Sequence, residues 1–313
     1  MGLSGSWDFT RTRREIIKEA YEIIGAIEPD ATVSTNEEAS AVTSLQLVIK
    51  QAHGEGLWLH TYQDAFVFLE KDKTQYSLGP SGDHTAEADD VVATTLSEAH
   101  STSATAIKVA SGTGTANSDN IGIELDDGTA HWTTVSSGGG TTTLTVASGI
   151  ASAAASGNTV YVYTSKIQRP LKITDPVLRD SNDIDVPVKI ISTSEYNALP
   201  NKTSDSSRIV LVAYDPQLTN GVLKVWPRTS NVVNRLSFSY KRPVQNIDGY
   251  GQHLEVPTEW LLWMTFELAY QLSYKQPMPL QERMLIRGEA DRLKEALTDY
   301  ESTSIFIDPV RRH

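Results

Sequence analysis

The sequence predicts an α+β fold: a helical core made of N- and C-terminal helix pairs with a β-meander, plus an inserted small all-β domain. Apolar residues recur at helical spacing near both ends of the chain, and short β-like runs fill its middle. The composition also changes abruptly after Gly82, which marks an insertion. With 313 residues, the chain is long enough for one large domain or two modest ones.

Two helices begin the core. Thr10 and Thr12 offer N-caps for the first helix, in which isoleucine and alanine recur at helical spacing. Ser34 stands three residues before Glu37, which is typical of a capping box, and the second helix then continues to Gly54. We expect the two helices to form an antiparallel hairpin.

A β-hairpin is predicted next, and it completes the first core segment, residues 1–82. The apolar run 65–69 and the run 75–78 are separated by the charged residues 70–73. A cluster of glycine, proline and serine at 79–82 then ends the pair.

Residues 83–165 are predicted to be the inserted domain, a β-sandwich or β-barrel module. From Asp83 to Tyr163 the only basic side chain is Lys108, against nine carboxylates. Asp127-Gly128 is a strong hairpin signal, because this pair tolerates positive φ angles. β-like runs recur at 106–109, 120–125, 130–135, 142–146 and 159–163. Their regularity favours a folded module over a low-complexity linker.

Residues 166–300 return to the core. Apolar residues at 186–188 and 190–191 suggest strands. A three-strand meander is then predicted from the runs 208–213, 221–226 and 235–240. Its turns fall at Asp215-Pro216 and at Pro227 to Asn231.

The C-terminal helix pair, Pro257 to Tyr300, is the most apolar part of the chain. Its first helix is predicted to be buried, because it carries Trp260, Leu261, Trp263, Met264, Phe266, Leu268, Tyr270 and Leu272. After a Pro-Met-Pro break, an amphipathic helix places apolar residues at spacings of four and three: Ile286, Ala290, Leu293, Leu297 and Tyr300. Its other side is either solvated or partner-binding, and carries Arg283, Arg287, Asp291, Arg292, Lys294, Glu295 and Asp299.

The composition limits the function. The net charge of −12 argues against a protein that grips nucleic acid through phosphate neutralisation, but allows a surface that nucleic acid passes without sticking. The absence of cysteine excludes disulfides and cysteine-based zinc sites. No apolar run has the length of a membrane span, and residues 1–8 lack a signal-peptide layout. We therefore expect a soluble protein made in a cytoplasm, without membrane contact.

Candidate catalytic and metal-binding residues match no known arrangement. His84 and His131 stand alone, and the carboxylates around Asp126 do not fit a calcium loop. The glycine clusters 112–114 and 138–140 lack the residues of a phosphate-binding loop. We expect no catalytic residue, metal or cofactor. A pair of carboxylates that cleaves glycosides stays open, because their separation is a structural property.

Several stretches, taken in order, resemble one family. They are Arg14-Glu15-Ile16-Ile17, Glu22-Ile23-Ile24-Gly25, Gly56-Leu57-Trp58, Tyr76-Ser77-Leu78-Gly79, Gly82-Asp83-His84, Tyr214-Asp215-Pro216-Gln217-Leu218, Asn220-Gly221 and Ser239-Tyr240-Lys241-Arg242-Pro243. This series resembles the head-to-tail adaptor family of short-tailed bacteriophages, also called tail accessory or packaged-DNA-stabilising proteins. The stretch from Asp119 to Gly128, with His131-Trp132-Thr133-Thr134, is similar to a β-module inserted in phage adaptor and tail proteins.

The resemblance implies a structural virion protein and not an enzyme. Members form a homo-oligomeric ring, a dodecamer in the family, which attaches below the portal protein and connects it to the tail nozzle or tail tube. Double-stranded DNA passes through the lumen without specific binding. Such a protein is made in the host bacterial cytoplasm and ends in the neck of the virion.

The resemblance also implies a portal-binding tail, which corresponds by position to residues 301–313. Its binding residues would be Ile305, Phe306, Ile307, Asp308, Pro309, Val310, Arg311 and Arg312. The apolar residues among them suit an anchor strand, and equally a terminal segment packed on its own domain.

The alternative function is a glycan-binding or glycan-cleaving tail protein. Its recognition surface would be the β-module, which offers Trp132, Tyr161 and Tyr163 as sugar-stacking residues. A capsid-decorating β-protein is a third possibility, which the long helices at both ends of the chain disfavour.

Overall fold

The computed structural model describes residues 10–55, 61–206, 208–230, 232–246 and 252–301. Its contacts divide the chain into two compact units. The helical unit combines Met1–Leu59 with Val244–His313, and the β unit is His60–Pro243. The described helices of the helical unit therefore come from before and after the β unit in the sequence.

The helical unit contains four α-helices and a short 3-10 turn among its described residues. They are α1 (Arg13–Ile23), α2 (Thr35–Gly54), η3 (Thr258–Trp260), α4 (Leu261–Ser273) and α5 (Leu280–Glu301). Of the two N-caps offered for the first helix, Thr12 is the one used, and the capping box predicted at Ser34 is confirmed; Thr12 forms a capping box as well. The backbone N–H of Thr12 donates to Glu15 at 2.7 Å, and that of Ser34 donates to Glu37 at 3.2 Å.

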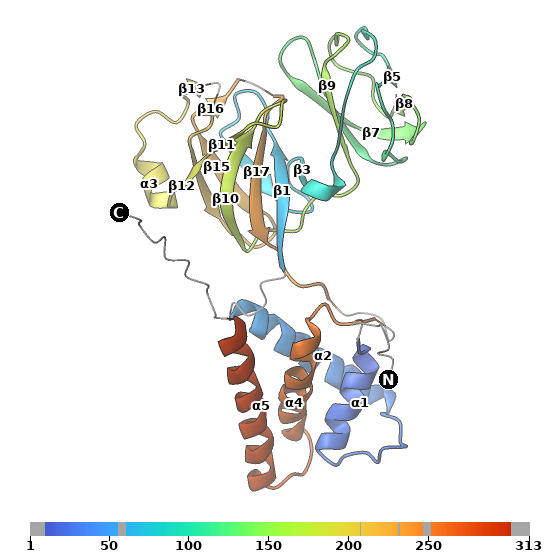
Figure 1. Cartoon of the computed structure of the whole chain (residues 1–313), viewed down its shortest axis with the longest axis vertical. Coiled ribbons are helices and arrows are strands. Elements are labelled where there is room, and N and C mark those ends of the chain that lie inside the picture. The colour runs from blue at the N-terminus through green and yellow to red at the C-terminus, as the bar shows by residue number, and fades with distance from the viewer. Residues whose placement is uncertain (1–9, 56–60, 207, 231, 247–251, 302–313) are drawn as a thin grey trace, which may run out of the picture. The chain divides into compact units, whose positions relative to one another are not determined.

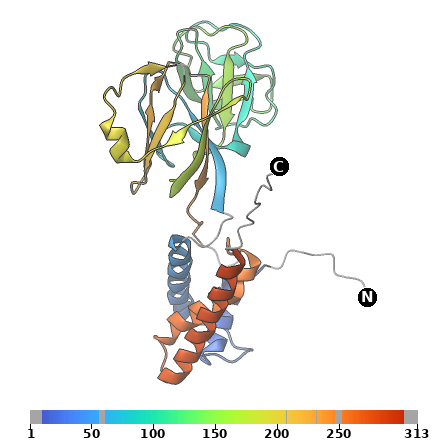
Figure 2. The same ribbon diagram turned by 60° about the vertical axis from the view of Figure 1, so that its left-hand side comes forward.

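The core of the helical unit forms around α4, which packs against α1, α2 and α5. In Figure 1, α5, α4 and α1 lie side by side, and the turned view of Figure 2 brings the α5 side forward. Met264, Leu268 and Leu272 of α4 are fully buried. The predicted buried helix is confirmed, and so is the amphipathic α5, whose Ile286 and Ala290 face the core.

The β unit contains two sheets that share one apolar core. The five-stranded sheet has the order β11 (Asp185–Pro187), β10 (Lys172–Arg179), β17 (Arg235–Lys241), β1 (Tyr62–Phe68), β3 (Thr85–Glu87). The four-stranded sheet has the order β12 (Lys189–Ile190), β14 (Leu211–Asp215), β15 (Gly221–Trp226), β2 (Gln75–Leu78). Leu236, Phe238 and Tyr240 of β17 pack with Leu223 and Val225 of β15 in this core. The remaining short elements here are η2 (Ala88–Asp90), α3 (Thr193–Ala198), β13 (Asp205–Ser206) and β16 (Arg228–Thr229).

A third, six-stranded antiparallel sheet comes from the predicted insertion and has its own apolar core. Its order is β4 (Val92–Thr95), β9 (Thr159–Tyr163), β6 (Asn120–Glu124), β7 (Ala130–Ser137), β8 (Thr143–Val146), β5 (Ala106–Lys108). A bridge between Leu96 and Val109 joins its two outer strands, so the sheet curls round on itself. Closure removes the open edges at which sheets aggregate. The turn predicted at Asp127-Gly128 connects β6 and β7, with Gly128 at a φ of 78°.

The fold class predicted from the sequence is wrong. The described residues are mostly β, with 17 strands in four sheets against five α-helices. The β structure is therefore not a small addition to a helical core. The two large sheets outside the insertion are assembled from strands far apart in the sequence, for example Ala65 beside Phe238. Local sequence patterns carry no signal for such pairs.

Two predicted strand pairings are also corrected. The runs 65–69 and 75–78 do not form a hairpin, because β1 pairs with β17 and β3 whereas β2 pairs with β15. The meander is only half right: β14 and β15 pair, but β17 lies in the other sheet. β17 pairs there with β10, a strand that the sequence analysis missed.

Candidate protein-binding site

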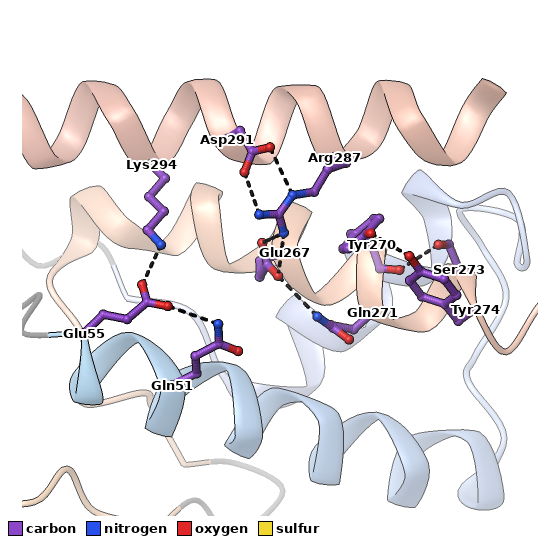
Figure 3. Close-up of polar contacts among 10 residues, drawn as sticks. All are labelled: Gln51, Glu55, Glu267, Tyr270, Gln271, Ser273, Tyr274, Arg287, Asp291 and Lys294. Atoms are coloured by element: carbon purple, nitrogen blue, oxygen red, sulfur yellow. Dashed lines mark hydrogen bonds and ion pairs between the residues drawn. The ribbon is translucent and has the colours of Figure 1, made fainter. Parts of the chain in front are cut away.

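Three helices form one continuous face of the helical unit, which we call the α2–α4–α5 face. Figure 3 shows α4 between α2 and α5, with charged and aromatic side chains bridging them. The sequence builds this arrangement because α4 is apolar around most of its circumference and is covered on several sides. The neighbouring helices are amphipathic and bring polar side chains to the rim.

Glu267 is the central polar residue of this face. Its carboxylate is buried and accepts hydrogen bonds from Arg287 at 3.1 and 3.2 Å and from Gln271 at 3.3 Å. The same guanidinium donates to Asp291, one turn further along α5, at 2.7 and 3.0 Å. Arg287 therefore bridges a buried and an exposed carboxylate. This arrangement fixes its side chain in one place.

A second ion pair connects α5 to α2. Lys294 donates to Glu55 at 2.5 Å, and Gln51 donates to the other carboxylate oxygen at 3.0 Å. These hydrogen bonds, that of Lys294 first, hold the pKa of Glu55 below its ordinary value. Between the two ion pairs lies a small hollow of about 30 Å³, with Trp263 among the residues that line it.

Tyr270 of α4 and Tyr274, the residue that caps the C-terminus of this helix, stand in line with two arginines of α5. Tyr270 and Tyr274 are one turn apart, their hydroxyl oxygens are 2.5 Å apart, and their rings meet edge to face. The guanidinium of Arg287 lies 5.1 Å from the ring centre of Tyr270, and that of Arg283 lies 4.5 Å from Tyr274. Residues at this spacing point to the same side of each helix. The two arginines therefore form fixed cation–π pairs with the two tyrosines.

Large apolar side chains remain exposed around these pairs. Leu280 and Met284 of α5 are 69% and 63% exposed, Tyr274 is 58% exposed, and Leu47 of α2 is 66% exposed. Leu47 lies four residues before Gln51, which lines the hollow of this face, so the two side chains point to the same side of α2. Exposed apolar groups gathered in one place mark interaction surfaces.

The residue types on this face are those of protein interfaces. Tyrosine, methionine and arginine are enriched where proteins meet, and tyrosine and arginine provide most hot spots. The arginines are held by Glu267, Asp291 and the tyrosine rings, so little side-chain entropy is lost when a partner binds. Chemically, the face is suited to recognition of another protein.

Only part of this site could be predicted from the sequence. Arg283, Arg287 and Lys294 were expected on a solvated or partner-binding side of the last helix, and all three lie on the α2–α4–α5 face. Glu267 and the tyrosine pair were not predicted as site residues. A glutamate within an otherwise apolar helix was the signal that a cation faces that position. The predicted portal-binding residues Ile305 to Arg312 lie outside the described residues.

In the β unit, the three aromatic residues suggested for sugar stacking pack against other side chains; Tyr161 and Tyr163 are buried and Trp132 is partly buried. Trp132 stacks on His84 with ring centres 3.9 Å apart, and Tyr163 is hydrogen-bonded to the same histidine at 2.7 Å. Tyr161 is buried and donates from its hydroxyl to the carbonyl of Val233 at 2.8 Å. These residues join the six-stranded sheet to the rest of the β unit and are not an exposed platform.

Two further findings concern the part of the chain that the structure describes. None of its helices is both long and apolar enough to cross a membrane. In the same residues, no group of three or more His, Asp or Glu side chains is placed to hold a metal ion.

Neither the family models nor the curated proteins that were searched match this chain.

Proposed function

We propose that this protein is a structural, non-enzymatic subunit of a phage head-to-tail adaptor that joins the portal to a short tail. The observation that carries the proposal is the α2–α4–α5 face, where exposed tyrosine, methionine and leucine side chains surround fixed arginines. The ordered resemblance of short stretches to the adaptor family supports it. The proposed partners are the portal protein and the tail nozzle or tube protein, in the neck of the virion.

Ring formation is proposed to use two different sides of the helical unit. In Figure 1, α4 lies between α1 and α5, so the side that carries α5 differs from the side that carries α1. A contact between unlike surfaces on successive copies is heterologous and generates a ring when the rotation between copies closes. The α5 side of one subunit would meet the α1 side of the next, in a dodecamer if the family's number holds.

Charge supports the passage of DNA through such a ring. The chain carries 39 acidic against 27 basic side chains, Lys and Arg being counted as basic. An acidic lumen repels the phosphate backbone, so DNA would slide without being held. The last segment of the chain, with Ile305 to Arg312, is proposed to bind the portal.

Surface substitutions test the role of the α2–α4–α5 face. The double variant Leu280→Asp/Met284→Asp places charges on two exposed side chains, so we expect the fold to be kept. We expect that this variant no longer assembles on portal rings, as measured by native mass spectrometry. Burying an unpaired carboxylate in the core of an interface has a high cost in binding free energy.

Ile184→Asp is the matched control, because Ile184 is also a large exposed apolar residue but lies in the β unit. It should assemble as the unchanged protein does. Normal assembly of the double variant on portal rings would show that this face is not the ring contact.

A further inference from the structure

An open groove of about 460 Å³ lies within the β unit, separate from the α2–α4–α5 face. Strands β4 and β9 of the six-stranded sheet form one wall, and the turn between β10 and β11 forms another. Its lining is mainly polar and includes Thr95, Glu124, Thr159, Asn182, Asp183 and Arg235. Such a groove offers many hydrogen-bonding groups and little apolar surface.

Arg235 is the fixed donor of this groove. Its side chain lies between two aromatic rings, 4.7 Å from the centre of Phe66 and 4.9 Å from that of Tyr161, and the residue is only 7% exposed. It donates to Asp183 at 2.9 Å. A guanidinium has five N–H donors, and Asp183 is its one acceptor among the described residues. Its Nε is buried, so the donor capacity that remains for a ligand oxygen lies on the two terminal nitrogens.

The neighbouring arginine, Arg179, is already neutralised by an ion pair, so it does not compete with Arg235 for Asp183. Arg179 lies directly opposite Arg235 on the adjacent strand and pairs with both oxygens of Asp185, at 2.7 and 2.8 Å. Two like charges opposite each other are unfavourable unless each has a counter-charge. Asp183 and Asp185 supply these charges from the same turn.

The turn between β10 and β11 holds Asp183, the acceptor of Arg235, in place. Asp180 accepts hydrogen bonds from the backbone N–H groups of Asn182 and Ile184 at 2.8 and 2.9 Å. Asp183 has a φ of 59°, a left-handed conformation that aspartate adopts more readily than most residues, and its side chain is exposed. The turn therefore presents an aspartate and an asparagine to the groove beside the arginine.

Charge decides which ligand fits. Two carboxylates, Asp183 and Glu124, line the groove against one guanidinium, so an anion would be repelled. A cation is also disfavoured, because it would have to approach the fixed positive charge of Arg235. We propose that the groove binds a neutral saccharide, in which adjacent hydroxyls accept from Arg235 and donate to Asp183. The amide of Asn182 and the hydroxyl of Thr95 complete the contacts. This activity does not depend on ring assembly.

The test is titration of the full chain with neutral oligosaccharides of glucose, galactose and N-acetylglucosamine, and with a hexuronate oligomer as the anionic probe, followed by saturation-transfer NMR. Asn182→Ala/Thr95→Val removes two polar groups at exposed positions and leaves the Arg235–Asp183 pair intact. Because two ligand hydrogen bonds are lost, we expect the dissociation constant to rise about 5- to 50-fold. Asn197→Ala/Thr143→Val, which makes the same changes outside the groove, should bind as the unchanged protein does.

Three outcomes would overturn the proposal. They are the absence of saturable binding to every neutral oligosaccharide, binding that the groove variant leaves unchanged, and binding confined to a hexuronate oligomer. Circular dichroism of the groove variant should match that of the unchanged protein, which would show that lost binding is not lost folding.

Discussion

His84 joins the six-stranded sheet to the rest of the β unit. Its ring stacks on Trp132 with an angle of 9° between the planes, and its Nδ1 lies 2.7 Å from the hydroxyl of Tyr163. Burial, and then the positive charge of Lys166, lower the pKa of His84 to about 4. The histidine is therefore neutral in the folded protein at neutral pH.

The lowered pKa of His84 predicts that acid destabilises the β unit. The unfolded chain binds a proton at a pH near 6.5 and the folded chain only near 4, so stability is complete above 6.5 and is lost as the pH falls between these values. One pKa unit corresponds to about 1.4 kcal/mol and His84 is partly exposed, so we expect a loss of about 2 kcal/mol.

Thermal unfolding of His84→Phe and of the unchanged protein, measured from pH 7 to pH 4, checks this prediction. The phenyl ring keeps the stack on Trp132 but does not titrate, so the variant should lose less stability on acidification. His131→Phe is the control and should follow the unchanged protein. Equal pH dependence in all three proteins would contradict the role of His84.

At the scale of an element, α5 is held by a narrow apolar stripe. Ala290 is fully buried, whereas Leu293, one turn further on, is only partly buried. A buried carboxylate without a partner costs several kcal/mol, and a partly exposed one costs less. We expect Ala290→Asp to destabilise the helical unit by about 3–5 kcal/mol and Leu293→Asp by about 1–2 kcal/mol. Chemical denaturation followed by tryptophan fluorescence measures both, and the reverse order would mean that α5 packs on another side.

Gly288 is a weak point within α5. It is exposed, and a Cβ added there would meet no atom within 4 Å. We expect Gly288→Ala to raise the free energy of unfolding by about 0.5–1 kcal/mol, because alanine loses less backbone entropy in a helix. Gly25→Ala is the matched control, since that position is equally open but has a φ of 65°, so it should be destabilising. Calorimetry that gave both changes the same sign would refute this explanation.

Local elements could be predicted from the sequence, and long-range pairing could not. The capping boxes at Thr12 and Ser34 depend on residues three positions apart, and the turn at Gly128 depends on two adjacent residues. The pairing of Ala65 with Phe238 depends on the whole chain, so the hairpin and part of the meander were predicted wrongly. The site was predicted in part for the same reason: the arginines of α5 were visible, but Glu267 and Tyr270 become their partners only once α4 and α5 are adjacent.

At the scale of the whole molecule, the two units carry different interaction chemistry. The helical unit presents the aromatic, apolar and arginine side chains of the α2–α4–α5 face. The β unit contains a polar groove and the acidic segment between Asp83 and Tyr163. This division suits a protein whose helices assemble with other copies while its sheets contact other molecules.

The mass of the purified protein, alone and mixed with portal rings, tests the adaptor proposal most directly. Native mass spectrometry or light scattering would measure it. We predict a species of low mass that becomes a defined multiple of the chain, twelve copies if the family's stoichiometry holds, only when the portal is present. A stable trimer whose mass does not change when portal rings are added would contradict the adaptor proposal and indicate a fibre or spike.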